Sequence, residues 1–173
     1  MIDLLDPTNV ITRMFDGENY DQLYNYCKDL LKKDPSDMLA LQNISLSLIY
    51  LKNFEEAVTY CDKVLEIKPS DAYAIKNKIF ALENLKQYDQ VLKLCEKLIQ
   101  IDSKDTWALN SMGISLNELD RHKDAILYYD TTLVIDPNDV TALMNKAISL
   151  SHLGNFQDAI NYYDLAQRID SSL

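Results

Sequence analysis

Apolar side chains recur along this chain at helical spacing, in two kinds of segment that alternate. In residues 38–51 they return every three or four positions, and a second run of the same kind covers residues 54–67. This spacing places the apolar positions on one face of an α-helix, so both runs predict amphipathic helices. The first run contains Leu41, Ile44, Leu48 and Leu51, and the second contains Ala57, Val58, Cys61, Val64, Leu65 and Ile67.

The pair of segments repeats with a strict period of 34 residues. Residues 54–71, FEEAVTYCDKVLEIKPSD, return as YDQVLKLCEKLIQIDSKD in 88–105 and as HKDAILYYDTTLVIDPND in 122–139. A period of this length is typical of repeat proteins in which each unit packs mainly on its neighbours. We therefore expect residues 1–173 to form a single array. Its five repeats are 4–37, 38–71, 72–105, 106–139 and 140–173.

Short polar breaks separate the expected helices. Pro69 cannot continue a helix, and Asp71 follows it as a good N-cap for the next one. The chain holds only three glycines and four prolines, which favours long helices joined by short turns. The position of Asp71 is taken in other repeats by Asp37, Asp105 and Asp139.

We call a set of equivalent positions, 34 residues apart, a slot. Small residues fill one slot of the first helix in repeats two to five, which allows two helices to approach closely. Larger apolar residues are expected to fill the remaining buried slots. The small slot holds Ala40, Ala74, Ala108 and Ala142. The larger slots hold Leu48, Leu82, Leu116 and Leu150; Leu51, Leu85, Leu119 and Leu153; and Ile67, Ile101, Ile135 and Ile169.

All three cysteines, Cys27, Cys61 and Cys95, share one slot. Members of a slot are separated by a whole helix pair, whereas a disulfide needs Cα atoms within about 7 Å. We therefore expect the cysteines to be small core residues that neither pair nor share a metal ion. Repeats four and five carry Tyr129 and Tyr163 in this slot.

The repeat resembles the tetratricopeptide repeat (TPR) family along essentially the whole chain. The family spacing of an aromatic residue, an alanine and a second aromatic residue is present as Phe156, Ala159 and Tyr163. It is present with the terminal proline as Ala125, Tyr129 and Pro137. The resemblance implies an all-α solenoid of antiparallel helix pairs in a right-handed superhelix. First helices would line its concave face, where members of the family usually bind peptides or proteins.

Departures from the family pattern are local. The small residue expected midway along the first helix is Ser45, Gly113 or Ala147, but the third repeat has Ile79. The terminal proline is replaced by Ser103 and Ser171 in two repeats. The opening helix of the first repeat is expected to be short and to begin near Pro7. None of these changes conflicts with the fold.

Composition and charge limit the kinds of partner that the protein is expected to bind. The net charge is −10 and the acidic residues are spread along the chain, which suits solubility or attraction for basic partners. Nucleic acid is not an expected partner, because phosphate binding needs clustered Lys and Arg. No run of about 18 apolar residues is present, and the first residues lack the features of a signal peptide. We therefore expect no membrane association and a cytoplasmic location.

No set of residues suggests catalysis. The three glycines stand far apart, and neither an HExxH nor a GxSxG motif occurs. His122 lies in an aromatic slot and is expected to be packed, whereas His152 is expected to face solvent. We therefore predict a non-enzyme without a metal or cofactor.

Some TPR domains hold the acidic C-terminus of a chaperone with a clamp of lysine, arginine and asparagine. Across the three possible registers of that clamp, Lys76 is the only cation, so we expect no binding of chaperone tails.

One slot of the first helices carries amide and hydroxyl side chains: Asn43, Asn77, Ser111 and Asn145. An amide both donates and accepts hydrogen bonds, so a ladder of such groups is suited to the backbone of an extended peptide. The alternative is that asparagine is simply common at this slot in the family.

Neighbouring slots carry apolar side chains that form a strip beside the ladder. Tyr and Trp are frequent anchors at protein interfaces, so this strip is a candidate binding surface. The alternative is that the strip packs between neighbouring first helices. Its candidate residues are Leu39, Leu46, Tyr73, Phe80, Trp107 and Ile114.

Two functional hypotheses follow. The first is a non-catalytic scaffold or adaptor that binds an extended peptide or a helix of a protein partner in the concave groove. The second is a structural module that assembles with itself through the groove or through an uncapped terminal repeat. At that terminus, Tyr163, Ala166 and Ile169 are expected to lack a covering helix.

Overall fold

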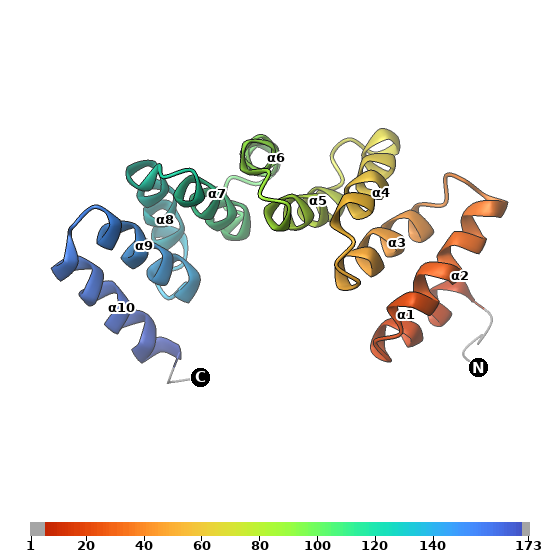
Figure 1. Ribbon diagram of the computed structural model, residues 1–173, viewed down its shortest axis with the longest axis horizontal. Coiled ribbons are helices and arrows are strands. Elements are labelled where there is room, and N and C mark those ends of the chain that lie inside the picture. Colours follow the sequence, from red (N-terminus) through yellow and green to blue (C-terminus); the bar gives the residue numbers. More distant parts are fainter. Residues whose placement is uncertain (1–5, 171–173) are drawn as a thin grey trace. The chain divides into compact units, whose positions relative to one another are not determined.

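The computed structural model describes residues 6–170, which form ten α-helices and contain no strand (Figure 1). Each repeat supplies one pair of helices, joined by a short turn. The helices lie in the segments that the apolar pattern predicts, including the short opening helix at Pro7. Their bounds are α1 (Pro7–Asp16), α2 (Tyr20–Lys33), α3 (Met38–Tyr50), α4 (Phe54–Ile67), α5 (Ala72–Asn84), α6 (Tyr88–Ile101), α7 (Thr106–Glu118), α8 (His122–Ile135), α9 (Val140–His152) and α10 (Phe156–Asp170).

The chain divides into two compact units, residues 1–86 and 87–173, with the boundary between α5 and α6. In the first unit, α2 packs on α3, α3 on α4 and α4 on α5. In the second unit, the same order runs from α6 to α10. First helices of successive repeats also touch each other, α3 with α5 and α7 with α9. Each unit thus has its own layer of first helices.

Small residues lie at the helix contacts, as predicted. The alanines of the small slot are buried, and so are Cys27, Cys61 and Cys95, which are free thiols. Burial raises the pKa of Cys27 to about 12 and that of Cys61 to about 11. A thiol with so high a pKa is unreactive at neutral pH, which fits a packing role.

Four of the residues predicted to lie in buried slots are exposed. Leu51 and the isoleucines at 67, 101 and 135 are exposed. The three isoleucines are the last residues of α4, α6 and α8, and Leu51 is the C-cap of α3. They continue the helical period, but they lie where the chain turns and no neighbouring helix covers them.

Each first helix ends in a left-handed turn. The residue two positions after the helix has a positive φ in all five repeats, and only the last of the five is a glycine. In the second repeat, the backbone N–H of Asn53 then donates to the carbonyl of Leu48 at 2.8 Å. This bond closes a Schellman motif and satisfies a carbonyl at the helix end. The five residues are Glu18, Lys52, Lys86, Asp120 and Gly154.

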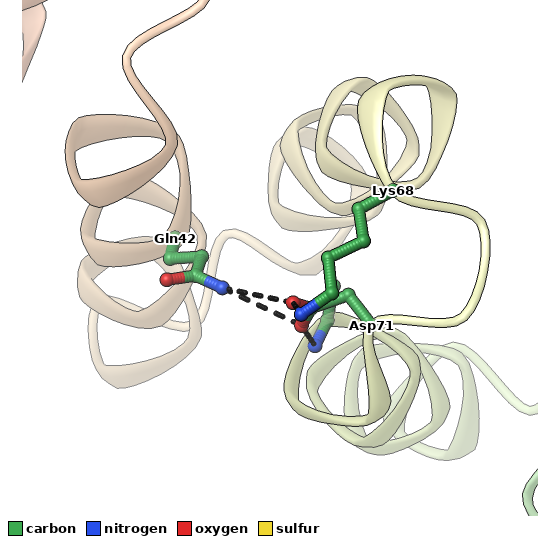
Figure 2. Close-up of polar contacts among 4 residues, drawn as sticks. Gln42, Lys68 and Asp71 are labelled. Atoms are coloured by element: carbon green, nitrogen blue, oxygen red, sulfur yellow. Dashed lines mark hydrogen bonds and ion pairs between the residues drawn. The ribbon is translucent and has the colours of Figure 1, made fainter. Parts of the chain in front are cut away.

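The predicted N-caps are confirmed, and two of them hold a second contact. Oδ1 of Asp71 accepts a hydrogen bond from the backbone N–H of Ala74 at 2.9 Å, and Oδ2 accepts one from Lys68 at 3.0 Å. Figure 2 shows that Gln42, on the preceding first helix, also reaches this carboxylate, at 3.4 Å from each oxygen. The cap of Asp71 therefore ties α5 to α3.

The same arrangement recurs in the second unit. Asp139 caps α9 by accepting from Ala142 N at 2.8 Å, and Nδ2 of Asn110 donates to its two oxygens at 3.1 and 3.0 Å. Gln42 and Asn110 occupy one slot. An amide in this slot thus connects successive first helices through the capping aspartate.

Replacing Asp71 with alanine is expected to lower the free energy of unfolding by about 2 kcal/mol. The lost cap accounts for about 1 kcal/mol, and the contacts with Gln42 and Lys68 account for the rest. Asp37 is the matched control. Its carboxylate caps α3, and among the described residues no side chain of another helix donates a hydrogen bond to it. Urea denaturation of the two alanine variants measures the difference. An equal loss in both would contradict the role of Gln42.

Acid should remove the contribution of Asp71. Burial raises the pKa of this carboxyl, but the hydrogen bonds from Ala74, Lys68 and Gln42 outweigh burial and hold it below its ordinary value of 3.8. The stabilisation is therefore present above 3.8 and is lost as the pH falls through the lower pKa of the folded state. In urea titrations, the difference between wild type and Asp71→Asn should shrink below pH 3.8.

Candidate functional site

In the first unit, the candidate residues lie on one side of α3 and α5. Leu39, Asn43 and Leu46 are spaced by four and three residues on α3, so they share a helical face. All three are half-buried, and Leu39 packs against the core. Leu39 and Leu46, the aliphatic residues of the strip on α3, are therefore only partly accessible to a ligand.

The aromatic residues of the strip on α5 are more open. The exposed fraction of Tyr73 is 46% and that of Phe80 is 45%. Partial burial nevertheless raises the pKa of the Tyr73 hydroxyl. These two large side chains flank Asn77 on the face that α5 presents beside α3.

The amides of the ladder are held by their own helices. Nδ2 of Asn43 donates to the carbonyl oxygen of Leu39 at 2.7 Å, and Nδ2 of Asn145 donates to that of Thr141 at 2.9 Å. Each amide retains a second N–H and its carbonyl oxygen for another partner. Asn77 differs: its Nδ2 is buried, and although it lies beside the Tyr73 hydroxyl, the geometry falls short of a hydrogen bond.

In the second unit, the candidates lie on α7 and α9. Trp107 is the second residue of α7 and is 37% exposed, and Ile114 is half-buried. Ser111 is buried, so its hydroxyl presents little surface to a ligand. On α9, Met144 and Ile148 are exposed beside Asn145 and extend the apolar strip. The sequence analysis did not select Met144, which has no equivalent among the candidate slots.

The two histidines form a stacked pair. The rings of His122, at the start of α8, and His152, at the end of α9, have centroids 4.4 Å apart and an interplanar angle of 13°. Nδ1 of His122 lies 3.1 Å from Oδ1 of Asn117. His122 is packed and His152 is exposed, as predicted. Across residues 6–170, no three His, Cys, Asp or Glu side chains come together as a metal site.

Within the described part of the chain, no helix has the length and apolar character needed to cross a membrane.

These helix pairs, with small residues at their contacts and a face of first helices within each unit, define a helical-repeat protein. The family described as "Psidin, N-terminal TPR repeats region" matches residues 46–163, about two thirds of the chain. The chain therefore belongs to the tetratricopeptide repeat family.

Solved structures agree on the fold. The chain is similar to MamA 41-end from Desulfovibrio magneticus RS-1, with a TM-score of 0.89 and 19% identity over 96% of this chain and 94% of that one. A second MamA structure matches with a TM-score of 0.86 and 16% identity, over 94% and 95% of the two chains. YrrB, described as a TPR protein with an unusual peptide-binding site, matches with a TM-score of 0.79 and 17% identity, over 96% and 86%. No curated protein matches the sequence. The fold is an all-α TPR solenoid.

Proposed function

We propose that the protein is a non-catalytic interaction scaffold that binds an extended peptide or a helix of a protein partner along its first helices. The single observation that carries this proposal is the exposure of Tyr73, Phe80 and Trp107 on those helices. Large aromatic side chains in such positions are the usual anchors of protein interfaces. Membership of the TPR family and the similarity to YrrB, a peptide-binding protein by its description, support the same class of function.

The amide ladder would supply the polar part of the site. Within each unit, the amide would use its free N–H and carbonyl oxygen to pair with a peptide backbone, while its hydrogen bond to the helix fixes it in place: Asn43 in the first unit and Asn145 in the second. Asn77 would turn its amide outward, because its buried Nδ2 makes no hydrogen bond in the free protein. Such backbone pairing is independent of the peptide sequence, so the aromatic residues would determine which peptides bind.

Truncating the aromatic anchors is expected to weaken binding strongly. The probe is a dodecapeptide selected from a random phage library against the immobilised protein. Phe80→Ala tests the first unit and Trp107→Ala tests the second. A lost aromatic anchor costs about 2 kcal/mol, which corresponds to roughly a 30-fold higher Kd. Isothermal titration calorimetry measures the effect.

Leu127→Ala is the matched control, because Leu127 is equally apolar and is exposed on the second helix α8. It should leave the Kd unchanged. Circular dichroism checks that each variant is folded. Selected peptides that bind both aromatic variants as tightly as wild type, or that lose affinity for Leu127→Ala, would place the binding surface elsewhere and refute the proposal.

A further inference from the structure

The last helix pair carries an apolar hollow that no other described helix covers. Its lining includes Ala147 and Ile148 of α9 and Ile160, Tyr163 and Asp164 of α10. Ile160 is 54% exposed and Tyr163 is 47% exposed. The two helices lie side by side at the blue end of the ribbon in Figure 1. This is a concave surface with apolar walls and one carboxylate. It shares Ile148 with the apolar strip on α9, but its lining contains no amide of the ladder.

The same slots are covered in the earlier repeats. On α4, Cys61 is fully buried and Val58 is half-buried where α5 packs. On α8, which packs on both α7 and α9, Tyr129 is fully buried and Ile126 is half-buried. These slots therefore form the seat of a first helix wherever such a helix follows in the same unit.

The carboxylate of the hollow also has counterparts, and both are paired with lysine. Asp164 shares its slot with Asp62 and Asp130. Asp62 forms an ion pair with Lys78 of α5. Oδ1 of Asp130 lies 2.5 Å from Nζ of Lys146 of α9. Asp164 itself is exposed, and no ion pair of its carboxylate occurs among the described residues.

The other two junctions show that the lysine accompanies the aspartate. Where α3 packs on α2, the slot of the acid holds Lys28 and the slot of the lysine holds Ile44. Where α7 packs on α6, Glu96 stands opposite Met112. Aspartate in this slot therefore faces lysine in both cases that the structure describes.

The helices that bring the lysine share a pattern on the face that enters the seat. An alanine stands four residues before the lysine, and a small residue stands three residues after it, so all three lie on one side of the helix. In α5 and α9 both small residues are buried. The residues are Ala74, Lys78 and Ala81 in α5, and Ala142, Lys146 and Ser149 in α9.

We propose that the α9–α10 hollow docks an amphipathic helix of a partner protein that carries this alanine–lysine–small pattern, with its ammonium group on Asp164. A second copy of this chain offers no matching terminal helix. In α1, the slot of the lysine holds Val10, and the slot of the alanine holds the N-cap Asp6. Charge complementarity with Asp164 thus favours a different protein as the partner.

The first test uses a peptide of known fit. A fluorescein-labelled peptide with the sequence of residues 139–153 is titrated with the protein, residues 1–173, and fluorescence anisotropy gives the Kd. Asp164→Lys is expected to raise the Kd at least tenfold. A peptide with Lys146→Asp should bind wild type equally poorly and regain affinity for Asp164→Lys. Asp158→Lys is the matched control, because it makes the same change of charge on another side of α10, and it should leave the Kd unchanged.

The second test removes the need for a free peptide to form a helix. Residues 140–153 are appended directly after Leu173, which places the added segment in register with the repeat. The appended segment should raise the Tm, and Asp164→Lys should cancel at least half of that rise while Asp158→Lys does not. The proposal would be overturned if wild type and Asp164→Lys bind the peptide equally in the first test. It would also be overturned if the appended segment raises the Tm by the same amount with and without Asp164→Lys. Concentration-dependent dimerisation of the unmodified protein that Asp164→Lys abolishes would overturn it as well, because the occupant would then be a second copy.

Discussion

Replacing Gly113 with alanine should lower the free energy of unfolding by about 2 kcal/mol, although alanine is the better helix former by about 1 kcal/mol. A Cβ atom at this position would lie 2.4 Å from Cε1 and 2.6 Å from Cζ of the Tyr129 ring. Tyr129 is fully buried, and its hydroxyl accepts a hydrogen bond from Nδ2 of Asn117 at 3.2 Å. Because the ring is enclosed and held at its far end, it has no free space into which to move.

Two facts about the slots explain this tight fit. The second repeat has Ser45 in the slot of Gly113 and Cys61 in the slot of Tyr129, and both are buried. In the second repeat, the first helix thus carries a side chain, that of Ser45, and the second helix carries a small residue, Cys61. The fourth repeat reverses the sizes, with no side chain on the first helix and a large ring on the second.

The exchange of the two residues provides a sharper test than the single change. Tyr129→Cys alone should cost about 3 kcal/mol by leaving a cavity, and Gly113→Ser alone should cost about 2 kcal/mol through the clash. The double variant recreates the pair of the second repeat, so its loss should be clearly smaller than the sum. Urea denaturation followed by Trp107 fluorescence reports on the same unit. Additive losses would show that the two residues do not depend on each other.

The second large effect is expected at Asp130. Asp130→Asn should lower the free energy of unfolding by about 2 kcal/mol, because it removes the counter-ion of an enclosed lysine. The side chain of Lys146 is only 9% exposed, whereas that of Asp130 is 49% exposed. Nζ of Lys146 keeps a hydrogen bond to the Tyr162 hydroxyl at 2.6 Å, which limits the loss.

Asp164→Asn is the matched control for Asp130→Asn, since it makes the same change in the same slot without a lysine opposite. It should change the stability by less than about 0.5 kcal/mol. Thermal and urea denaturation of both variants, compared with wild type, measure the difference. If both asparagine variants lose the same stability, the contact of Lys146 with Asp130 does not hold α9 on α8.

The pH dependence of this contact can be measured separately. Burial lowers the pKa of Lys146, but the hydrogen bonds to Asp130 and Tyr162 outweigh it and raise the pKa above its ordinary value of 10.5. The stabilisation is therefore complete below 10.5 and is lost as the pH rises through the raised pKa of the folded state. The difference in unfolding free energy between wild type and Lys146→Met should stay constant around neutral pH and narrow above 10.5. A difference that does not change with alkaline pH would contradict this.

Features that depend on local chemistry were predictable from the sequence. The 34-residue period located the helix pairs, and the capping aspartates at 37, 71, 105 and 139 accept the expected backbone hydrogen bonds. Features that depend on a neighbouring helix were not. Ile67 fits the helical period but is exposed, and Gln42 gave no local sign that it would reach Asp71. Periodicity indicates which side of a helix is apolar, but it does not show how far along the helix a neighbour extends.

The candidate binding surface was only partly predictable. The sequence placed Asn43, Asn77 and Asn145 in one slot, but it could not show that two of these amides bond to their own helices. It also could not show that Ser111 is buried. Peptide binding by this face stays a prediction. The sequence analysis missed the Asp130–Lys146 pair. It could have been found, because Asp62 and Lys78 occupy the same two slots two repeats earlier.

The left-handed turns after the first helices are positions at which glycine would raise the free energy of unfolding. Lys52, Lys86, Asp120 and Glu18 occupy a backbone region that costs side-chain-bearing residues about 1 kcal/mol relative to glycine. Glycine at these four positions would change neither the first-helix face nor the α9–α10 hollow. Such a background should offset part of the stability that the damaging variants lose, so that loss of binding could be measured separately from loss of folding.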